Sequence, residues 1–214
     1  METQVSLTGP EASGRLTIYS CTQAMYFSMG VVAAHLGLPL NRLKFVGGTV
    51  GGGFGGKGDT ATETITALLA LKANRPVKWR WTREEEFLAS PTRQPVILTL
   101  RSGCKKDGTL TFRTVHTLHD NGAYTSWGAT TPFVMMQTIS SLYRVPHCLY
   151  HTKAVYTNNP YAGSFRGYGN LQATFAVEQH MDMMAKAVGM DPLAFRLKNA
   201  QDAGEVTPQG MHFK

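Results

Sequence analysis

The sequence has few cysteines, and their number and spacing exclude several classes of protein. Its 214 residues include three cysteines, at positions 21, 104 and 148, without a C-x-x-C pair. An odd count without such a pair excludes a disulfide framework and a zinc ribbon. It also excludes an iron–sulfur cluster held by this chain alone, because such clusters usually take four cysteine ligands. We expect reduced, mostly buried thiols.

Long apolar runs are missing as well. Charged residues make up only 16% of the chain, yet every uncharged apolar run is far shorter than the ~20 residues that cross a bilayer. Residues 1–10 are polar and lack the basic and apolar regions of a secretory signal. We therefore expect a cytoplasmic protein without a membrane partner.

The positive charge does not form a patch typical of nucleic-acid binding. The formal net charge is +7, but the basic residues are scattered, and the densest group, 78–83, runs directly into three glutamates at 84–86. Alternation of Lys78 and Arg80 is typical of the solvated face of a strand. We predict no nucleic-acid partner, while an anionic substrate or an acidic protein partner stays open.

Hydrophobic periodicity predicts both helices and strands without strict β–α–β alternation, which indicates an α+β fold. With 43% hydrophobic residues, the chain can bury one large core or two small ones. We expect Thr22 to be the N-cap of the first helix and Asp191 to cap the last. Strands are predicted over 16–20, 42–46 and 149–157, an antiparallel sheet over 77–81, 96–102 and 110–119, and helices over 23–36, 60–74, 133–142, 171–188 and 192–199.

Segment 47–58 holds eight glycines in twelve residues. Such a density raises the entropic cost of folding without any packing benefit, so we predict a functional loop. The stretch 51–57 satisfies the P-loop pattern G-x-x-x-x-G-K, but Gly58 stands where a Ser or Thr must bind magnesium. The stretch 51–56 also matches the dinucleotide pattern G-x-G-x-x-G, yet no acidic residue follows about 20 positions on. An NADP-dependent oxidoreductase that uses Arg75 or Lys78 remains an alternative.

Three motifs together resemble the molybdenum hydroxylases, the family of xanthine dehydrogenases and aldehyde oxidases. Residues 50–57, VGGGFGGK, are similar to that family's G-G-G-F-G-G-K loop. Residues 20–23, SCTQ, are similar to a pattern that places a Gln at the start of a helix. Residues 157–169, TNNPYAGSFRGYG, are similar to T-N-x-P-x-x-x-F-R-G-F-G. The motifs occur in the family's order and spacing, and the resemblance covers residues 3–208.

The resemblance implies the fold of the first molybdopterin-binding domain, with a mixed sheet and packed helices. Residues 1–214 would form the first half of the cofactor-binding region. The implied cofactor is molybdopterin, as Mo-molybdopterin or its cytosine dinucleotide, with [2Fe-2S] clusters and FAD on partner subunits or domains. The implied reaction is hydroxylation of an aromatic, N-heterocyclic or aldehyde substrate, a small molecule, with oxygen derived from water.

The resemblance also implies which residues hold the cofactor. The amide of Gln23 is a neutral donor for a metal oxo group, placed near the positive end of a helix. Glycine backbone brings N–H groups together as an anion-binding nest, and the guanidinium of Arg166 offers forked donors. Gln23, Phe54 through its backbone, and Arg166 would form the second shell of the molybdenum. The complete implied set is Gln23, Gly52, Gly53, Phe54, Gly55 and Arg166.

Several positions depart from the family pattern and bear on the substrate. An acidic residue often stands at the position of Gly58, and a substrate-orienting Arg near that of Val134; both departures count against xanthine. Copper-containing carbon monoxide dehydrogenases carry a Cys where this chain has Gly163, so a copper ligand is missing there. Tyr168 occupies the position of an aromatic residue that stacks near the substrate ring, and core packing beside Phe165 is the alternative.

The resemblance implies a general base that this chain does not supply. Family members use a Glu in a G-E motif near the end of the molybdenum subunit; this chain has one Gly-Glu pair, Gly204-Glu205, which we do not assign to that motif. We therefore expect no catalytic residue in this chain, which would be a fragment or a split subunit that needs a C-terminal half. Two ordinary interpretations stay open: an exposed first-turn Gln23, and an Arg166 paired with Glu178. A basic assembly or nucleic-acid-binding domain is the non-enzymatic alternative.

Overall fold

The computed structural model describes residues 1–212, which form two compact units. The first unit comprises Met1–Arg93 together with Gly163–Arg166, and the second comprises Gln94–Ala162 together with the chain from Gly167 onward. Each unit has its own sheet and its own hydrophobic core. Within residues 1–212, no helix combines the length and the apolar character needed to cross a membrane.

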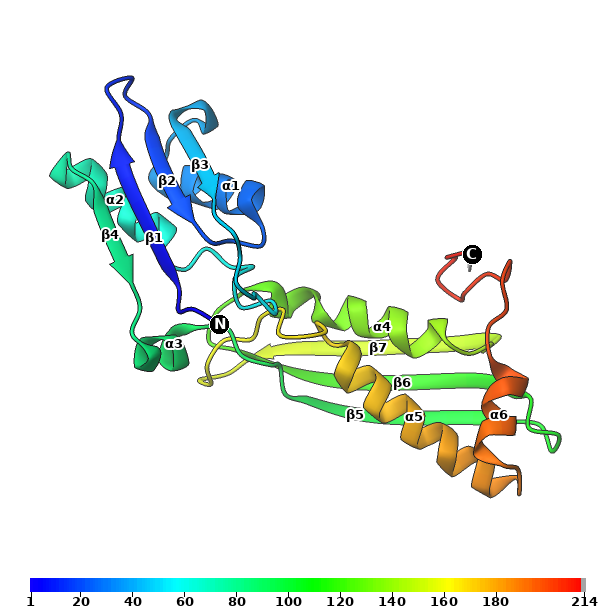
Figure 1. Cartoon of the computed structure of the whole chain (residues 1–214). Coiled ribbons are helices and arrows are strands. Elements are labelled where there is room, and N and C mark those ends of the chain that lie inside the picture. Colours follow the sequence, from blue (N-terminus) through cyan, green and yellow to red (C-terminus); the bar gives the residue numbers. More distant parts are fainter. Residues whose placement is uncertain (213–214) are drawn as a thin grey trace. The chain divides into compact units, whose positions relative to one another are not determined.

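The first unit is a four-stranded mixed sheet with helices packed on one face (Figure 1). The strand order is β3-β2-β1-β4; β1 is antiparallel to both neighbours, and β2 and β3 are parallel because α1 returns the chain between them. The elements are β1 (Val5–Pro10), β2 (Leu16–Ser20), α1 (Met25–Leu36), the 3₁₀ turn η1 (Leu40–Arg42), β3 (Leu43–Gly47), α2 (Glu63–Ala73), β4 (Val77–Arg80) and α3 (Arg83–Ala89).

The core of this unit is small and carries a polar seam. Ile18 of β2, Val32 of α1 and Ala67 of α2 are completely buried and belong to one cluster. Beside them, the hydroxyl of Thr66 on α2 is hydrogen-bonded to Ser6 at 2.9 Å and to Thr8 at 3.0 Å, both on β1. These bonds satisfy buried hydroxyls and fix the helix against the sheet.

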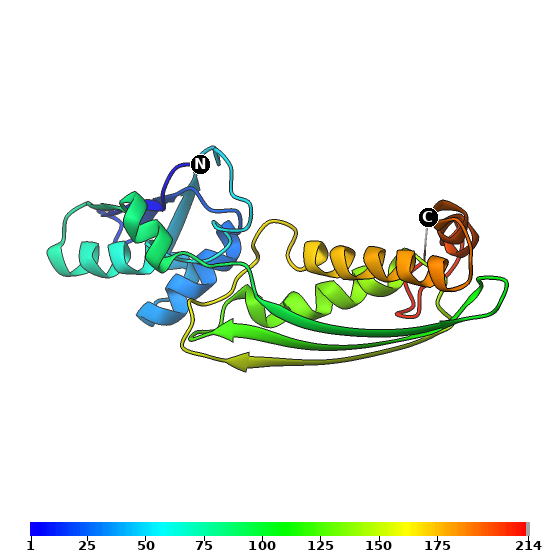
Figure 2. The same ribbon diagram turned by 90° about the horizontal axis from the view of Figure 1, so that it is seen from below.

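The second unit is a three-stranded sheet, order β5-β6-β7, in which β6 pairs antiparallel with β5 and parallel with β7. Helices α4 and α5 lie on the same face of this sheet (Figure 2). The elements are β5 (Val96–Cys104), β6 (Leu110–Gly122), η2 (Trp127–Thr130), α4 (Thr131–Ser141), β7 (His147–Tyr156), α5 (Asn170–Ala187) and α6 (Pro192–Asn199).

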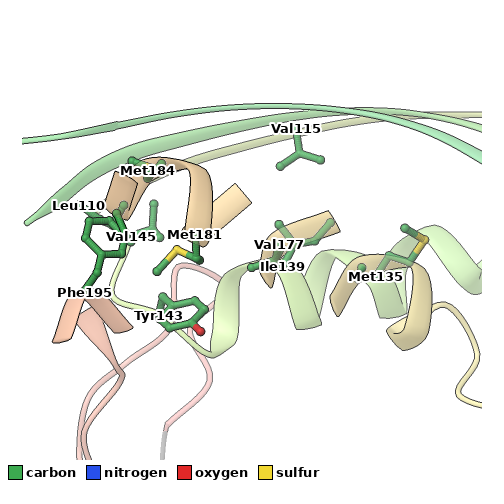
Figure 3. Packing of buried hydrophobic residues seen from close by; sticks show 12 residues of the cluster. Leu110, Val115, Met135, Ile139, Tyr143, Val145, Val177, Met181, Met184 and Phe195 are labelled. Atoms are coloured by element: carbon green, nitrogen blue, oxygen red, sulfur yellow. The ribbon is translucent and has the colours of Figure 1, made fainter. Parts of the chain in front are cut away.

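Inward-facing side chains of the second sheet pack against these helices. Figure 3 shows Val115 of β6 in one cluster with Ile139 of α4 and with Val177 and Met181 of α5. Arg113 is also fully buried in this unit. Its Nη1 donates to the carbonyl oxygen of Ile139 at 2.7 Å, which satisfies an orphan carbonyl in the last turn of α4. The guanidinium therefore fastens that helix end to the sheet.

The α+β prediction is confirmed, but two details were wrong: the sheet that holds residues 77–80 and the N-cap of the first helix. Residues 77–80 do not join the middle sheet; β4 pairs with β1 in the first unit. Strand β7, for which no partner was predicted, is parallel to β6, so the second sheet is mixed, as the fold class predicted. Thr22 is not the N-cap of α1: the cap is Ala24, and the Thr22 hydroxyl instead accepts from the Ala24 amide at 3.0 Å. The helix begins at Met25 because Gln23 is held by another segment.

One β-strand and one α-helix were missed, and one helix cap was confirmed. Strand β1 was not predicted from the sequence because it is short and its polar residues face the core. Helix α3 was not predicted either, although Thr82 and Glu85 form a complete capping box, which is a recognisable sequence signal. The side chain of Asp191 caps α6 as expected, accepting from the amides of Leu193 and Ala194.

Candidate functional site

The glycine-rich segment leaves β3 and turns sharply, with backbone conformations that favour glycine. Gly52 and Gly55 have φ values of 113° and 88°, and Phe54, which carries a side chain, has φ of 50°. A bulky residue in this left-handed region is strained and is held there by its surroundings. The loop is therefore a fixed structure whose shape is set by close contacts on both sides.

Those contacts explain why glycine is needed at two positions of the loop. A Cβ added to Gly53 would lie 2.3 Å from Cδ of Gln23. A Cβ added to Gly55 would lie 1.3 Å from the carbonyl oxygen of Ser164. Gly53 is therefore packed against one neighbouring segment and Gly55 against the other, which the glycine count alone did not reveal.

The side chain of Gln23 is bound to this loop through its oxygen. The side-chain Oε1 accepts from the backbone amides of Gly55 at 3.0 Å and Lys57 at 3.3 Å. The backbone N–H of Gln23 donates to the Lys57 carbonyl oxygen at 2.9 Å. Because two N–H groups face Oε1, the orientation of the side-chain amide is fixed. Its Nε2 is left as a donor, and no acceptor within residues 1–212 takes it.

Three consecutive peptide N–H groups of the loop also lack a protein acceptor within the described chain: those of Gly52, Gly53 and Phe54. Gly53 itself is buried. Buried N–H groups in native proteins nearly always have a partner. Successive N–H groups in a loop with left-handed residues form a cavity that suits acceptor-rich or anionic groups.

The second motif contributes residues 163–166 to the same unit. The amide of Arg166 donates to the carbonyl oxygen of Phe54 at 2.8 Å, and the Ser164 hydroxyl lies 3.4 Å from the carbonyl oxygen of Gly55. The Arg166 guanidinium carbon lies 5.9 Å from the centre of the Phe54 ring. The structure thus brings Gln23, the glycine loop and Arg166 together in the first unit.

Arg93 is a member of this cluster that the sequence did not indicate. Its Nη2 donates to the carbonyl oxygen of Arg166 at 2.8 Å, and its guanidinium carbon lies 5.1 Å from the centre of the Phe165 ring. Burial, and then the neighbouring charge of Arg166, lower the pKa of Arg93, but an arginine remains protonated in proteins. No motif surrounds Arg93, so only the folded contacts identify it.

The two residues predicted for a substrate pocket, Val134 and Tyr168, lie in the second unit. Val134 is half-buried on α4. The Tyr168 hydroxyl is hydrogen-bonded to Thr130 and donates to the carbonyl oxygen of Trp127 at 3.1 Å. The Tyr168 and Trp127 rings meet edge to face, with centroids 6.4 Å apart. Tyr168 is therefore fixed beside a second aromatic residue, Trp127, that the sequence did not single out.

Glu178, the alternative partner considered for Arg166, is bonded elsewhere. Its carboxylate accepts from Nε of Arg196 at 2.7 Å and from the hydroxyl of Tyr143 at 2.8 Å. Burial, and then the hydrogen bond with Glu178, raise the pKa of Tyr143 to about 12. This network joins α5, α6 and the segment that follows α4 inside the second unit, and it does not include Arg166.

Donors dominate the surface formed by the two loops: three peptide N–H groups, the Nε2 of Gln23 and the guanidinium of Arg166. Such a surface fits a group rich in acceptor oxygens, sulfurs or negative charge. A molybdopterin centre has this character, and the absent side chains at Gly52, Gly53 and Gly55 let the backbone approach it closely. The residues present therefore fit the group that the sequence motifs implied.

The chain is similar to solved structures and to curated relatives. The fold matches an aldehyde oxidoreductase from Desulfovibrio desulfuricans with a TM-score of 0.92 and 26% identity, over 98% of this chain and 23% of that one. The chain is similar to a nicotinate dehydrogenase large molybdopterin subunit of Eubacterium barkeri, 39% identical over 193 residues. It is also similar to a xanthine dehydrogenase molybdenum-binding subunit of Escherichia coli, 39% identical over 211 residues.

These matches cover 89% and 97% of this chain, but only 45% and 28% of the nicotinate and xanthine dehydrogenase subunits, respectively. The chain thus spans less than half the length of either relative. The nicotinamide-dependent and nucleic-acid-binding alternatives find no support among the comparisons. The family model described as "Molybdopterin cofactor-binding domain" matches residues 1–200. The chain therefore belongs to the molybdopterin cofactor-binding domain family.

Proposed function

We propose that this chain is the first half of the cofactor-binding region of a molybdenum-dependent hydroxylase of the xanthine dehydrogenase and aldehyde oxidase type. The observation that carries the proposal is the meeting of two distant motifs: the Arg166 amide donates to the Phe54 carbonyl at 2.8 Å, while Gln23 holds the other side of the same loop. The donors left over, at Gln23 Nε2 and residues 52–54, face no protein acceptor within residues 1–212.

In this proposal the chain binds and orients the cofactor but does not move protons. Gln23 donates from Nε2, and the peptide groups of 52–54 donate from the backbone. Arg166 offers its guanidinium and is itself held by Arg93. The bound cofactor would supply the transfer of a water-derived oxygen to an electron-poor carbon and would accept the two electrons released. The base that assists this step would come from the C-terminal half.

The partners proposed are that C-terminal half and subunits or domains with [2Fe-2S] clusters and FAD. The outer face of the second sheet supports a covered surface in the assembled enzyme. Ile97 and Leu118 are register neighbours on β5 and β6 and are 68% and 41% exposed, and Leu149 on β7 is 57% exposed. Apolar side chains gathered on one face of a sheet are typical of an interface.

The proposed substrate is a small aromatic, N-heterocyclic or aldehyde compound. The edge-to-face pair of Tyr168 and Trp127 offers a fixed aromatic surface of the kind that packs against planar rings. The apolar Val134 stands where purine enzymes would place an orienting Arg, which favours a substrate other than xanthine. Relatives named for nicotinate and for aldehydes are consistent with both remaining classes.

Substitution of Gln23 in the assembled enzyme tests the proposal. Gln23→Glu keeps an oxygen that accepts from Gly55 and Lys57 but replaces the Nε2 donor by an anionic oxygen. We expect a loss of turnover of roughly 100-fold, as for other preorganised donors, and a lowered molybdenum content. Gln179→Glu, on the exposed face of α5, is the matched control and should resemble the wild type.

Each result of this experiment has a clear meaning. Normal molybdenum content and normal turnover in Gln23→Glu would remove Gln23 from the cofactor site. Binding of a nicotinamide cofactor by an assembly that holds no molybdenum would support the dinucleotide alternative instead. Salt-sensitive binding of random DNA at physiological ionic strength would favour a nucleic-acid-binding domain.

A further inference from the structure

Lys57 closes the glycine loop, and its side chain points into the protein. The side chain is 2% exposed, and its ammonium forms an ion pair with Glu2, whose side chain is 33% exposed. A buried ammonium group is unfavourable unless a partner compensates its charge. Glu2 is the only carboxylate paired with Lys57 within residues 1–212. The loop thus ends in the buried ammonium group of Lys57, whose charge is compensated by the Glu2 carboxylate.

Residues 2–4, which we call the strap, bind the loop at several points. The Glu2 carboxylate accepts from the amide of Gly51 at 3.4 Å as well as from Lys57. Nε2 of Gln4 donates to the carbonyl oxygen of Gly56 at 2.6 Å. The strap therefore contacts the first residue of the stretch 51–57 and its last two.

The strap is itself anchored to β4, to α3 and to Trp81 between them. The amide of Gln4 donates to the Glu86 carboxylate on α3 at 2.8 Å, and the Trp81 amide donates to the carbonyl oxygen of Gln4 at 2.9 Å. Nε of Arg80 lies 3.3 Å from the hydroxyl oxygen of Thr3. Strand β4 and helix α3 thereby hold the strap, and the strap holds the loop.

The peptide groups of Lys57 connect this buried pair to Gln23. The Lys57 amide donates to Gln23 Oε1 at 3.3 Å, and the Lys57 carbonyl accepts from the Gln23 amide at 2.9 Å and from the Thr22 hydroxyl at 3.2 Å. A movement of the Lys57 backbone that brings its side chain toward solvent would displace these peptide groups. Such a movement would turn the side-chain amide of Gln23 away from its present orientation.

We propose that Glu2 and Lys57 are positioning residues for the cofactor: their buried ion pair holds the loop so that Nε2 of Gln23 and the N–H groups of residues 52–54 face the bound molybdopterin. This inference rests on the proposed function. Neither residue touches the cofactor; both act through Gln23 and the loop backbone. Loss of the Glu2 carboxylate leaves the ammonium of Lys57 buried without a compensating charge. The loop then moves away from the position in which its donors face the cofactor.

The test uses Glu2→Gln in the assembled holoenzyme, with Glu11→Gln as the control. Glu11 lies just beyond the opposite end of β1, its side chain is 34% exposed, and it faces Lys44 at 3.9 Å, so the charge change and exposure are matched. We expect Glu2→Gln to lose molybdenum about 10-fold faster, in the range of substitutions that orient metal-site ligands. Its Mo(V) electron paramagnetic resonance spectrum should also shift, because the donors near the metal move. Glu11→Gln should match the wild type in both measurements.

A double variant separates positioning from simple instability. Glu2→Gln combined with Lys57→Met removes both charges, so no buried charge is left unpaired and the assembly should form. We expect this variant to keep a shifted spectrum even where stability returns. A wild-type spectrum and wild-type retention of molybdenum in the double variant would overturn the inference. If the assembled wild-type enzyme itself contains no molybdenum, the proposed function is overturned instead. The metal content of the wild type therefore distinguishes the two failures.

Discussion

The backbone amide of Arg166 donates to the carbonyl oxygen of Phe54 at 2.8 Å, and both residues have positive φ, 22° and 50°. Residues with side chains occupy this region only where the surrounding structure imposes it. The hydrogen bond joins the two loops at residues that both have a left-handed backbone conformation. A change that breaks it should therefore disturb both loops together, while the sheets of the two units stay intact.

Gly55→Ala is the sharpest way to separate the loops. The new Cβ would overlap the carbonyl oxygen of Ser164, and the φ of 88° is unfavourable for alanine. We expect loss of most bound molybdenum with little change in helix and strand content by circular dichroism. Gly56→Ala is the control, since its Cβ has no neighbour nearer than 3.4 Å. Equal molybdenum contents in the two variants would contradict the proposed contact.

Gly53→Ala should act by displacing Gln23. The added methyl would overlap the Gln23 side chain, whose flexible end can move aside, so the fold should persist. We expect the effects of Gly53→Ala and Gln23→Ala on turnover to be similar and the double variant to be no worse than either. Non-additivity of this kind marks residues that act through one interaction. Effects that simply add would show that Gly53 acts independently of Gln23.

Arg93→Lys should weaken the hold on Arg166 without changing the net charge. Lysine keeps a cation but lacks the planar fork that now spans the Phe165 ring and the Arg166 carbonyl. We expect a several-fold faster loss of molybdenum, roughly 1 kcal/mol in free energy for one hydrogen bond of this kind. Arg75→Lys, at an exposed position of the first unit, should behave as wild type. Identical loss rates in the two variants would remove Arg93 from the site.

The sequence predicted which residues the structure brings together in the candidate site better than it predicted the contacts between them. Gln23, Phe54 and Arg166 were recognisable because their motifs have fixed spacing. Arg93 has no motif and was found only by its contact with Arg166. The strap was missed for a related reason: Glu2 lies far from Lys57 in sequence, and no local pattern reports a pair formed by folding.

Fold prediction succeeded where the hydrophobic periodicity was strong, and it failed where the structure depends on which strands pair with each other. The helix over 171–188 was predicted nearly to the residue because its apolar stripe is long. Strand β4 was assigned to the wrong sheet because its composition does not encode its partner, β1. The start of α1 was misplaced because Gln23, a good first-turn residue, is bound by the loop instead.

Buried His119 makes the stability of the second unit depend on pH. Burial lowers its pKa to about 4, from 6.5, so the unfolded chain binds a proton first as the pH falls. Its stabilising effect is complete above pH 6.5 and is lost progressively between pH 6.5 and about 4. We expect the free energy of unfolding in urea to fall by about 2 kcal/mol between pH 6.5 and pH 5 from this group.

His119→Gln provides the comparison, because an amide can still bond to Gln94 and Thr117, the present partners of the imidazole. Half-buried His180, whose pKa is also lowered by burial and then by the charge of Arg113, contributes with the same sign in both proteins. The variant should therefore lose most, but not all, of the pH dependence in this range. The same slope in the variant and the wild type would show that His119 is not the group that titrates.

The most direct test of the central claim is an anomalous-difference map of the assembled enzyme, measured at the molybdenum absorption edge. The account predicts a molybdenum peak beside Nε2 of Gln23, within reach of the Phe54 backbone and the Arg166 guanidinium. A peak in an active enzyme at a place that none of these three residues approaches would contradict it.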